Sequence, residues 1–467
     1  MISLLRLFSE LNLAFPDMLL ILASFILIIL KNFLNGKCLN SVFPKVSLIL
    51  SLILLIVVLA CHPYTKQLNT ELFVYSSAIE QIKTCLFVCL CAWFSYIYYM
   101  RSYEALNANF FILIYGIANA INLSISANNF VTLIIALELY TFSVGFLLLN
   151  DCNDTSHRKC AIRFLLTSAV MSAILIFGCS LLYFHFGSLS FSNIKVSIGW
   201  ETAFGSVLVL CAMLFKLGGA PFHSWMLDVY EKSSSIVVLL FEAIWKFFMV
   251  FIFMKIVYIF MGIHFFKVIL KFSAIITMLL GAIMPIFQKG IHRFIASVAV
   301  GHVGFIVSVV PIAKAAPAIM TYMGYQSLAV FCFLSGILLL KKYRTVVEFG
   351  DLSGIMKAAP TYGALMLFSM CALCGVPPFG NFFAKLNIFT ILLESKNYLL
   401  LVIASMYSII SIAYVIKWIR FFFKSPGGEQ VCVGGKPAAT VLLFMLPLST
   451  LFYGFILRLF SKIFIFI

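Results

Sequence analysis

Apolar residues run through this chain in long, uninterrupted stretches, and this feature limits its possible folds more than any other. Hydrophobic residues fill 63% of the 467 positions and charged residues only 10%, whereas a soluble domain carries about 25% charged residues. One protein core cannot hide so much apolar surface, but a lipid bilayer can. The sequence therefore excludes a water-soluble domain.

The length of these stretches predicts helices. A helix needs about 20 apolar residues to cross a bilayer, whereas a membrane β-strand alternates apolar and polar residues over about 10 positions. We therefore predict an all-α polytopic membrane protein with about 14 transmembrane helices. The predicted spans centre near Ser24, Ile53, Cys89, Ile117, Leu139, Ile174, Cys211, Trp245, Thr277, Val300, Val330, Ser369, Ser408 and Pro447.

The basic residues lie mostly in the short loops between these spans. The net charge of +16 is therefore interpreted as a topology signal, and nucleic acid is not expected as a partner. With the N-terminus on the non-cytoplasmic side, the inside loops hold 17 Lys and Arg residues and the outside segments hold 10. This excess predicts that both termini lie on the non-cytoplasmic side.

The sequence carries no recognisable cofactor motif. Most of its 13 cysteines lie within apolar stretches, as Cys85, Cys89 and Cys91 do, where they are typical of small buried residues rather than of zinc or iron–sulfur ligands. No glycine-rich nucleotide loop and no Ser/His/Asp triad emerges. We expect no metal and no cofactor bound by this chain itself.

Two segments, residues 215–225 and 374–385, are predicted to be broken helices. Each combines glycines, a Pro-Phe pair and an aromatic residue three positions after that Phe. Proline removes a backbone donor and clashes with the preceding turn, so each helix should be interrupted. Interrupted backbone survives at membrane depth only inside protein or beside a watery cavity.

The broken segments are the seventh and twelfth predicted spans, which indicates an internal repeat. Spans 4–8 and 9–13 then form two five-helix units of opposite topology, each broken at its fourth helix, as in many transporters. The predicted division is a three-helix segment at 1–104, a first repeat at 105–262, a second repeat at 263–425 and a final helix at 426–467.

Five of the ionisable residues inside the predicted spans stand out, because a charge there is costly and usually functional. Glu138 lies within an apolar stretch of the fifth span, and Lys216 directly precedes the first break. Lys246 is central in the eighth span, and Lys385 follows the second break. His302 is the polar residue of the tenth span, where Glu138 would fall in the second repeat. We predict that these five residues handle protons.

Other charged residues allow two interpretations. Glu242 lies four residues before Lys246, so it either pairs with that lysine or only compensates its charge locally. Glu80 and Lys83 lie near the start of the third span and are expected at the membrane interface.

The two breaks and the fifth span also resemble a known family. Residues 215–231, the triplet Leu137-Glu138-Leu139, and residues 375–379 followed by Lys385 are similar to motifs of the antiporter-like subunits of respiratory complex I. Residues 228–231, Asp-Val-Tyr-Glu, are most similar to subunit N, which is mitochondrial subunit 2.

The resemblance implies roles for four of the five residues. It implies that Glu138 and Lys216 form a pair, that Lys246 is the central lysine and that Lys385 is the exit-side lysine. One departure is at 233–236, where this chain has Ser-Ser-Ser-Ile in place of the family's usual Pro-Thr-Pro element. The break before the eighth span therefore lacks its prolines.

The implied function is proton translocation within NADH:quinone oxidoreductase, an enzyme whose redox chemistry occurs elsewhere. NADH, FMN, iron–sulfur clusters and quinone are expected in partner subunits, and the partners include paralogous antiporter-like membrane subunits and the lipid bilayer. The expected location is a bacterial inner membrane, or alternatively the mitochondrial inner membrane.

Two other functions compete with this one. A Mrp-type monovalent cation/proton antiporter subunit shares the fold and would show sodium-dependent transport without redox partners. A membrane scaffold that transports nothing has no use for costly buried charges on several helices.

Overall fold

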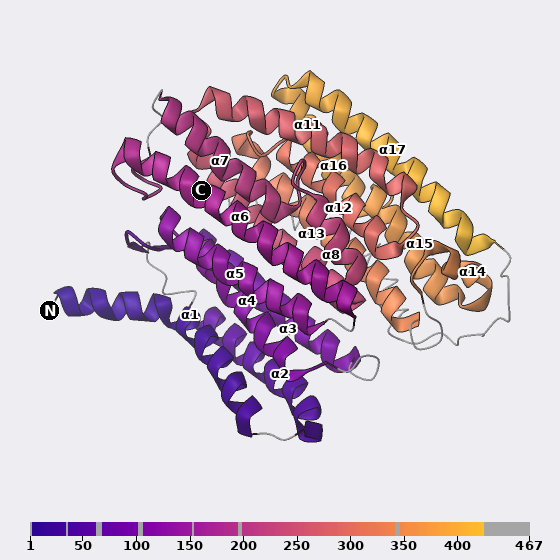
Figure 1. Cartoon of the computed structure of the whole chain (residues 1–467), viewed down its shortest axis with the longest axis horizontal. Coiled ribbons are helices and arrows are strands. Elements are labelled where there is room, and N and C mark those ends of the chain that lie inside the picture. The colour runs from indigo at the N-terminus through magenta and orange to yellow at the C-terminus, as the bar shows by residue number, and fades with distance from the viewer. Residues whose placement is uncertain are drawn as a thin grey trace. The chain divides into compact units, whose positions relative to one another are not determined.

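The computed structural model describes residues 2–33, 36–61, 68–100, 106–151, 154–194, 199–340 and 346–424. Nearly all of them form helices (Figure 1), which confirms the all-α prediction. A short hairpin precedes the third helix. Its two strands, β1 (Leu68–Asn69) and β2 (Val74–Tyr75), have two residues each. The chain divides into two compact units, one ending at Leu208 and the other beginning at Val209.

The first unit holds six long helices, which pack mainly against neighbours in sequence. α1 also packs against α4, so the first and fourth helices lie together. Each helix forms from a long apolar stretch. In lipid such a stretch must be helical, because a helix pairs its own backbone N–H and C=O groups. The helices are α1 (Ile2–Phe33), α2 (Gly36–Cys61), α3 (Ser77–Met100), α4 (Ala108–Ser126), α5 (Phe130–Asn150) and α6 (Thr155–Phe186).

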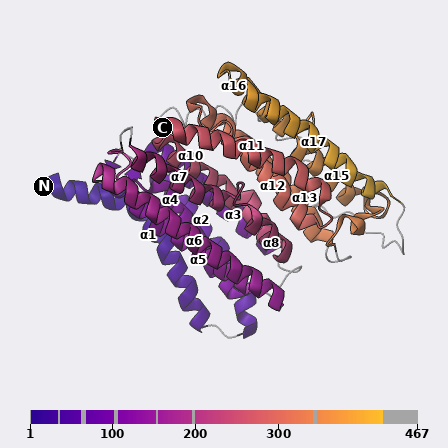
Figure 2. The ribbon, with the colours of Figure 1, turned by 45° about the horizontal axis from the view of Figure 1, so that its top comes forward.

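The second unit holds the remaining helices, and α7 (Trp200–Leu217) contains the boundary between the units. α11 and α17 lie side by side in Figures 1 and 2, and α11 also packs along α12. The helices are α8 (Ser224–Lys232), α9 (Ser235–Leu240), η2 (Phe241–Trp245), α10 (Lys246–Ile259), α11 (His264–Phe287), α12 (Ile291–Val307), η3 (Ala313–Ala315), α13 (Ala316–Leu340), η4 (Phe349–Leu352), α14 (Ile355–Ala358), α15 (Pro360–Cys374), α16 (Gly380–Glu394) and α17 (Tyr398–Phe423).

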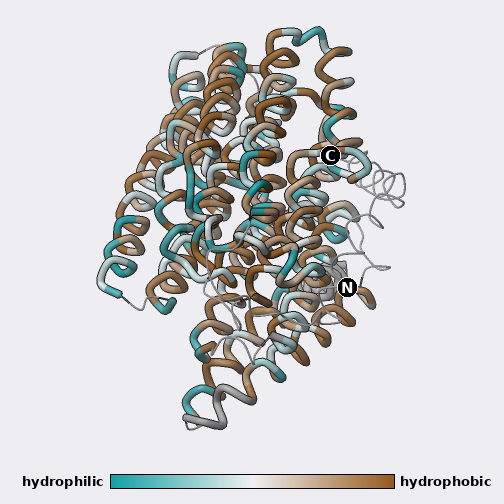
Figure 3. The backbone as a smooth tube through the Cα atoms, turned by 90° about the vertical axis from the view of Figure 1, so that its right-hand side faces the viewer, coloured by the Kyte–Doolittle hydropathy of each residue, from teal (hydrophilic) through white to brown (hydrophobic). Residues whose placement is uncertain are grey.

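The structure confirms most of the predicted spans. Among the described residues, 11 helices are long and apolar enough to cross a membrane, and α12 and α15 are shorter apolar helices. Figure 3 shows how hydrophobic residues predominate along the helices. Thirteen of the predicted centres fall within helices, and the fourteenth, near Pro447, lies outside the described residues.

Exposure separates the helices that face lipid from those that form the core. Large apolar side chains such as Phe184, Phe272 and Ile409 are more than half exposed on α6, α11 and α17, as expected of lipid-facing surfaces. By contrast, 94% of the apolar stretch within Ser235–Ile259 is buried. The helix that carries Lys246 is therefore surrounded by protein.

Glycines allow α11 and α12 to approach closely. A Cβ atom on Gly281 would lie 2.1 Å from the Cα of Gly301, and one on Gly304 would lie 2.5 Å from the backbone nitrogen of Met278. Small residues commonly bring membrane helices together in this way, because the backbones can then touch. This contact fixes the position of α12, which carries His302.

The two predicted repeats share a local feature. Asn129, just before α5, forms an antiparallel bridge with Ser190 after α6. Gly290, just before α12, forms the same kind of bridge with Glu348 after α13. In each repeat, therefore, the start of the second helix is joined to the segment that follows the third.

Candidate functional site

The structure confirms both predicted breaks. α7 ends at Leu217 and α8 begins at Ser224, and α15 ends at Cys374 and α16 begins at Gly380. The first residues beyond the broken helices, Gly218 and Gly375, have φ angles of 75° and 74°. These left-handed conformations favour glycine, and they turn the chain out of the helix.

Side chains satisfy the backbone groups that the first break leaves free. The Trp225 indole nitrogen donates to the Phe215 carbonyl at 2.9 Å, and the Ala220 amide donates to the Thr277 hydroxyl at 3.1 Å. Buried backbone groups need such partners, because no water replaces them in the bilayer. The broken segment is therefore held in place by α8 and α11.

The second break is satisfied in an equivalent way, and here one of the predicted lysines takes part. Asn381 donates to the Ala372 carbonyl at 3.0 Å, and the Lys385 ammonium donates to the Cys374 carbonyl at 2.6 Å. Lys385 is only 3% exposed. A side chain on Gly375 would press on Lys385, since a Cβ there would lie 2.9 Å from Cδ.

His302 lies in the buried part of α12 between two tyrosines. Its Nδ1 shares a short hydrogen bond with the Tyr322 hydroxyl of α13, and the Tyr407 hydroxyl of α17 lies 3.4 Å from the same nitrogen. Gly301 makes room for Tyr407, because a Cβ at Gly301 would lie 2.5 Å from that ring. The Nε2 atom has no hydrogen-bond partner among the described residues.

Tyr407 also connects His302 to Lys385. The Lys385 ammonium lies 5.6 Å from the centroid of the Tyr407 ring, which is within the range of a cation–π contact. The second break, α12 and α17 therefore meet around one aromatic side chain.

Lys246 pairs with Glu242, which decides between the two interpretations of that glutamate. The Lys246 ammonium donates to a Glu242 carboxylate oxygen at 2.8 Å, and the Tyr230 hydroxyl donates to the same oxygen at 2.7 Å. Both partners are buried. Glu242 lies within the π-helical turn η2, and Lys246 directly follows this turn. Such a local widening of a helix often marks a functional site.

These contacts bring three of the five predicted residues into one region of the second unit. Lys246 also donates to the carbonyl of Ala299, one turn before His302, at 3.3 Å. We call Lys246, Glu242, His302, Tyr407 and Lys385 the polar line. Each of its side chains can both release and accept a proton through nitrogen or oxygen.

Glu138 and Lys216 are the other two predicted residues. Glu138 lies on α5 in the first unit, and one of its carboxylate oxygens is buried without a hydrogen-bond partner among the described residues. Lys216 is 9% exposed and lies in the last turn of α7, in the second unit. The pairing of Glu138 with Lys216 stays a prediction.

The repeat relation between Glu138 and His302 is offset by one turn when it is counted from the two bridges. Glu138 lies nine residues after Asn129, and His302 lies twelve residues after Gly290. The residue nine positions after Gly290 is Ala299, whose carbonyl accepts from Lys246.

One sequence interpretation needs correction, and the structure explains one departure from the family pattern. Lys83 is 1% exposed and Glu80 is 4% exposed, so neither lies at a solvated interface. Lys83 can be buried because it is paired with Asp17 of α1. The break before the eighth span forms without prolines, because the Ser234 hydroxyl caps α9 by accepting from the Val237 amide.

Sequence reasoning missed three tyrosines, one in the polar line and two that contact its members. They are Tyr230, Tyr322 and Tyr407, three of 19 tyrosines. Tyr230 lies within the Asp-Val-Tyr-Glu stretch, but nothing there indicated a contact with Glu242, and Tyr322 and Tyr407 lie in no motif. In the part of the chain that the structure describes, no group of three or more His, Cys, Asp and Glu side chains could hold a metal ion.

Comparisons with known proteins agree on one family. Residues 127–411 match the family model described as NADH:quinone oxidoreductase/Mrp antiporter, TM. The NADH-quinone oxidoreductase subunit N of Pelagibacter ubique is 29% identical over 333 residues, which cover 70% of this chain and 71% of that protein.

Solved structures share the fold. A chain of respiratory complex I from Thermus thermophilus superposes with a TM-score of 0.79 at 20% identity, covering 95% of this chain and 98% of that one. A chain of the Mrp complex from Dietzia sp. gives a TM-score of 0.81 at 16% identity, covering 98% and 97%.

Proposed function

This chain belongs to the NADH:quinone oxidoreductase/Mrp antiporter membrane family, and from that premise we propose that it translocates protons as subunit N of an NADH:quinone oxidoreductase. The observation that carries the proposal is the polar line: Lys246 donates to the Ala299 carbonyl one turn before His302, and His302 and Lys385 both lie against Tyr407. The related proteins named subunit N support the assignment to that subunit. The protein is a multi-pass protein of the inner membrane.

In this proposal the polar line passes protons between groups that can each carry one. A neutral histidine has one N–H and one lone pair, so it can accept a proton at one nitrogen while releasing one at the other. The Nε2 atom of His302 is free to accept, and Nδ1 faces the hydroxyls of Tyr322 and Tyr407. Lys246 and Lys385 then serve as the charged stations on either side.

Glu242 gives Lys246 a fixed partner. When Lys246 holds its proton, the Glu242–Lys246 pair is neutral and the buried charges compensate each other. When the proton leaves, Tyr230 still donates to the Glu242 carboxylate. We propose that this hydroxyl stabilises the pair while the lysine is neutral.

The redox chemistry belongs to partner subunits in this proposal. NADH, FMN, iron–sulfur clusters and quinone would be bound there, and other membrane subunits, including paralogous antiporter-like ones, would flank this chain. The four-part division into 1–104, 105–262, 263–425 and 426–467 is likewise proposed, and the matching breaks and bridges support its two repeats.

A Mrp-type cation/proton antiporter is the alternative, and the shared fold supports it. Sodium-dependent exchange by a complex that holds no redox subunits would favour it. Recovery of NADH-driven quinone reductase activity with the tagged chain would favour the proposal above.

Lys216 offers a direct test of the proton role. We expect Lys216→Ala to lower proton uptake severalfold in inverted vesicles during NADH-driven quinone reduction, with the complex still assembled. Lys216→Arg should also pump poorly, because a guanidinium keeps its proton at any physiological pH. Rates are measured per assembled complex.

Lys232→Ala is the matched control, because Lys232 is an exposed lysine in the last turn of α8. It should pump normally. If Lys216→Arg pumped normally while Lys216→Ala did not, Lys216 would supply only a fixed charge.

A further inference from the structure

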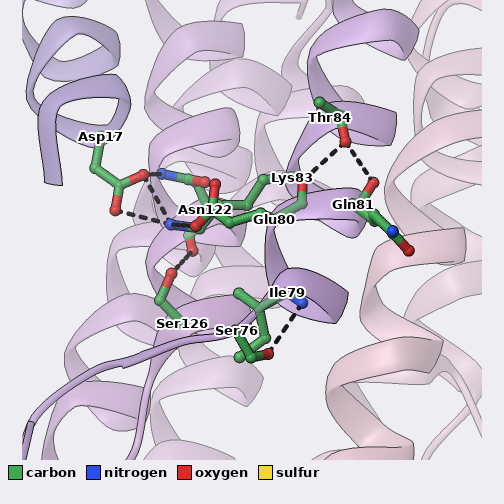
Figure 4. Close-up of polar contacts among 9 residues, drawn as sticks. All are labelled: Asp17, Ser76, Ile79, Glu80, Gln81, Lys83, Thr84, Asn122 and Ser126. Carbon is green, nitrogen blue, oxygen red and sulfur yellow. Dashed lines mark hydrogen bonds and ion pairs between the residues drawn. The ribbon is translucent and has the colours of Figure 1, made fainter. Parts of the chain in front are cut away.

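A second cluster of buried charged side chains lies in the first unit, apart from the residues proposed above to carry protons (Figure 4). Asp17 comes from α1, Glu80 and Lys83 come from α3, and Asn122 comes from α4. The four residues are 8%, 4%, 1% and 1% exposed, respectively. Ionisable groups so deep in a membrane helix bundle are costly and usually have a function.

Asp17 is the best-satisfied member of this cluster. The Lys83 ammonium donates to both of its carboxylate oxygens, at 3.0 and 2.9 Å, and the Asn122 amide donates to one of them at 2.7 Å. The Tyr75 hydroxyl also interacts with this carboxylate. So many donors stabilise the charged carboxylate, so Asp17 is the partner that compensates Lys83.

Glu80 is left with much weaker contacts. Its nearest charged partner is Lys83, at 3.5 Å, and the same carboxylate oxygen accepts no hydrogen bond within the described part of the chain. Asn122 is also buried, and its side-chain carbonyl oxygen has no hydrogen-bond partner among the described residues. Two acceptors in one buried cluster therefore await a donor.

The charges of the cluster do not balance. Among the described residues, two carboxyl groups share one ammonium, so ionisation of both leaves one surplus negative charge in a buried position. An uncompensated buried charge is strongly unfavourable, and an ionisable group relieves it by taking up a proton. Glu80, with the fewest donors, is the group that can do so.

Within the residues that the structure describes, the surrounding elements add one further titratable group, Tyr75 of the hairpin. Burial, together with the Asp17 and Glu80 carboxylates, raises the pKa of the Tyr75 hydroxyl well above its usual value. Tyr75 therefore stays protonated and acts as a donor. α4 contributes only the uncharged Asn122 to this cluster, so the surplus charge falls on the two carboxyl groups.

The hairpin lies against the cluster and is joined to the end of α4. The Lys83 ammonium lies 4.9 Å from the centroid of the Tyr75 ring. Phe73 forms a bridge with Ala127 at the end of α4, and the next residue, Asn128, donates to the Thr70 carbonyl at 2.7 Å. The hairpin thus covers the cluster, and the turn residue Glu71 is exposed.

We propose that Asp17, Glu80, Lys83 and Asn122 form a proton-binding site in which Glu80 takes up and releases one proton. On uptake, an O–H bond forms on the Glu80 carboxyl and one breaks in a hydronium ion, which becomes water; on release, the proton returns to water. In the protonated state the Glu80 hydroxyl is a new donor, and the free Asn122 oxygen is an acceptor inside the same cluster. The cluster shares no residue with the polar line, so this proposal does not depend on proton pumping by the polar line.

The test is an infrared pH titration of the assembled, resting complex, because a protonated carboxyl has a carbonyl stretch that a carboxylate lacks. We expect a band that appears as the pH falls in the wild-type complex and is lost in Glu80→Gln. Glu71→Gln is the matched control, since Glu71 is an exposed glutamate of the same hairpin, and it should keep the band.

Asp17→Asn provides a second variant that does not remove the titrating group. It leaves one carboxylate for one ammonium, so Glu80 should pair with Lys83, and the titrating band should be lost while the complex still assembles. The proposal fails if Glu80→Gln keeps the wild-type band. It also fails if Asp17→Asn leaves the band unchanged, because the proton would then not depend on the surplus charge.

Discussion

Replacing Lys246 with methionine is expected to reduce proton pumping per assembled complex by at least about tenfold, since a positioned proton-transfer group typically contributes about 10²–10⁴-fold to a rate. Lys246 also balances Glu242 in a buried pair at 2.8 Å, and breaking such a pair costs about 3–5 kcal/mol. We therefore expect less assembled complex as well. Pumping is measured as NADH-driven proton uptake in inverted vesicles, and assembly as the complex recovered from membranes.

The double variant Glu242→Gln/Lys246→Met separates these two losses. It removes the unpaired carboxylate and keeps a Tyr230 partner in the glutamine oxygen, so assembly should recover. Pumping should stay low, because no group at 246 carries a proton. Recovery of both would mean that Lys246 is only a structural partner of Glu242.

Gly281→Ala is expected to destabilise the second unit by about 3 kcal/mol or more, at the upper end of the cost of overpacking. The added Cβ would lie 2.1 Å from Gly301 Cα and 2.3 Å from its nitrogen, and backbone atoms cannot move aside as a side chain can. α11 and α12 would have to separate, which shifts His302 away from Tyr407. The measurement is thermal stability and yield of the purified complex.

Gly324→Ala is the matched control, because a Cβ on this glycine of α13 meets nothing within 4 Å. It should be neutral or stabilise the helix by up to about 1 kcal/mol, the usual difference between alanine and glycine in a helix. Equal stability of the two variants would contradict the close packing of α11 on α12.

Several site residues could be predicted because their signal is local. Lys246, His302 and Lys385 are polar residues within apolar stretches, and the structure places all three in one buried region. A charge in a membrane span is exceptional, so position along the sequence suffices to single it out. Position along the sequence also misled us for Lys83. This lysine lies near the start of a span, where a membrane-interface lysine is expected, and its partner Asp17 lies far away in the sequence.

The partners of these residues could not be predicted. Tyr407 lies 105 residues after His302, and Lys83 lies 66 residues after Asp17. Nothing near a tyrosine in the sequence distinguishes one that contacts a histidine from one that faces lipid.

The sequence by itself determined that this is a helical membrane protein, where its spans run and where two of them break. These are local properties, because a helix satisfies its own backbone in lipid and Gly and Pro interrupt it wherever they occur. Only the tertiary structure decided which faces of the helices are buried and which polar side chains meet, as at Lys246 with Glu242 and Ala299. The physical reason is that lipid is as apolar as the protein interior, so hydrophobic periodicity carries little information about which face packs against which helix.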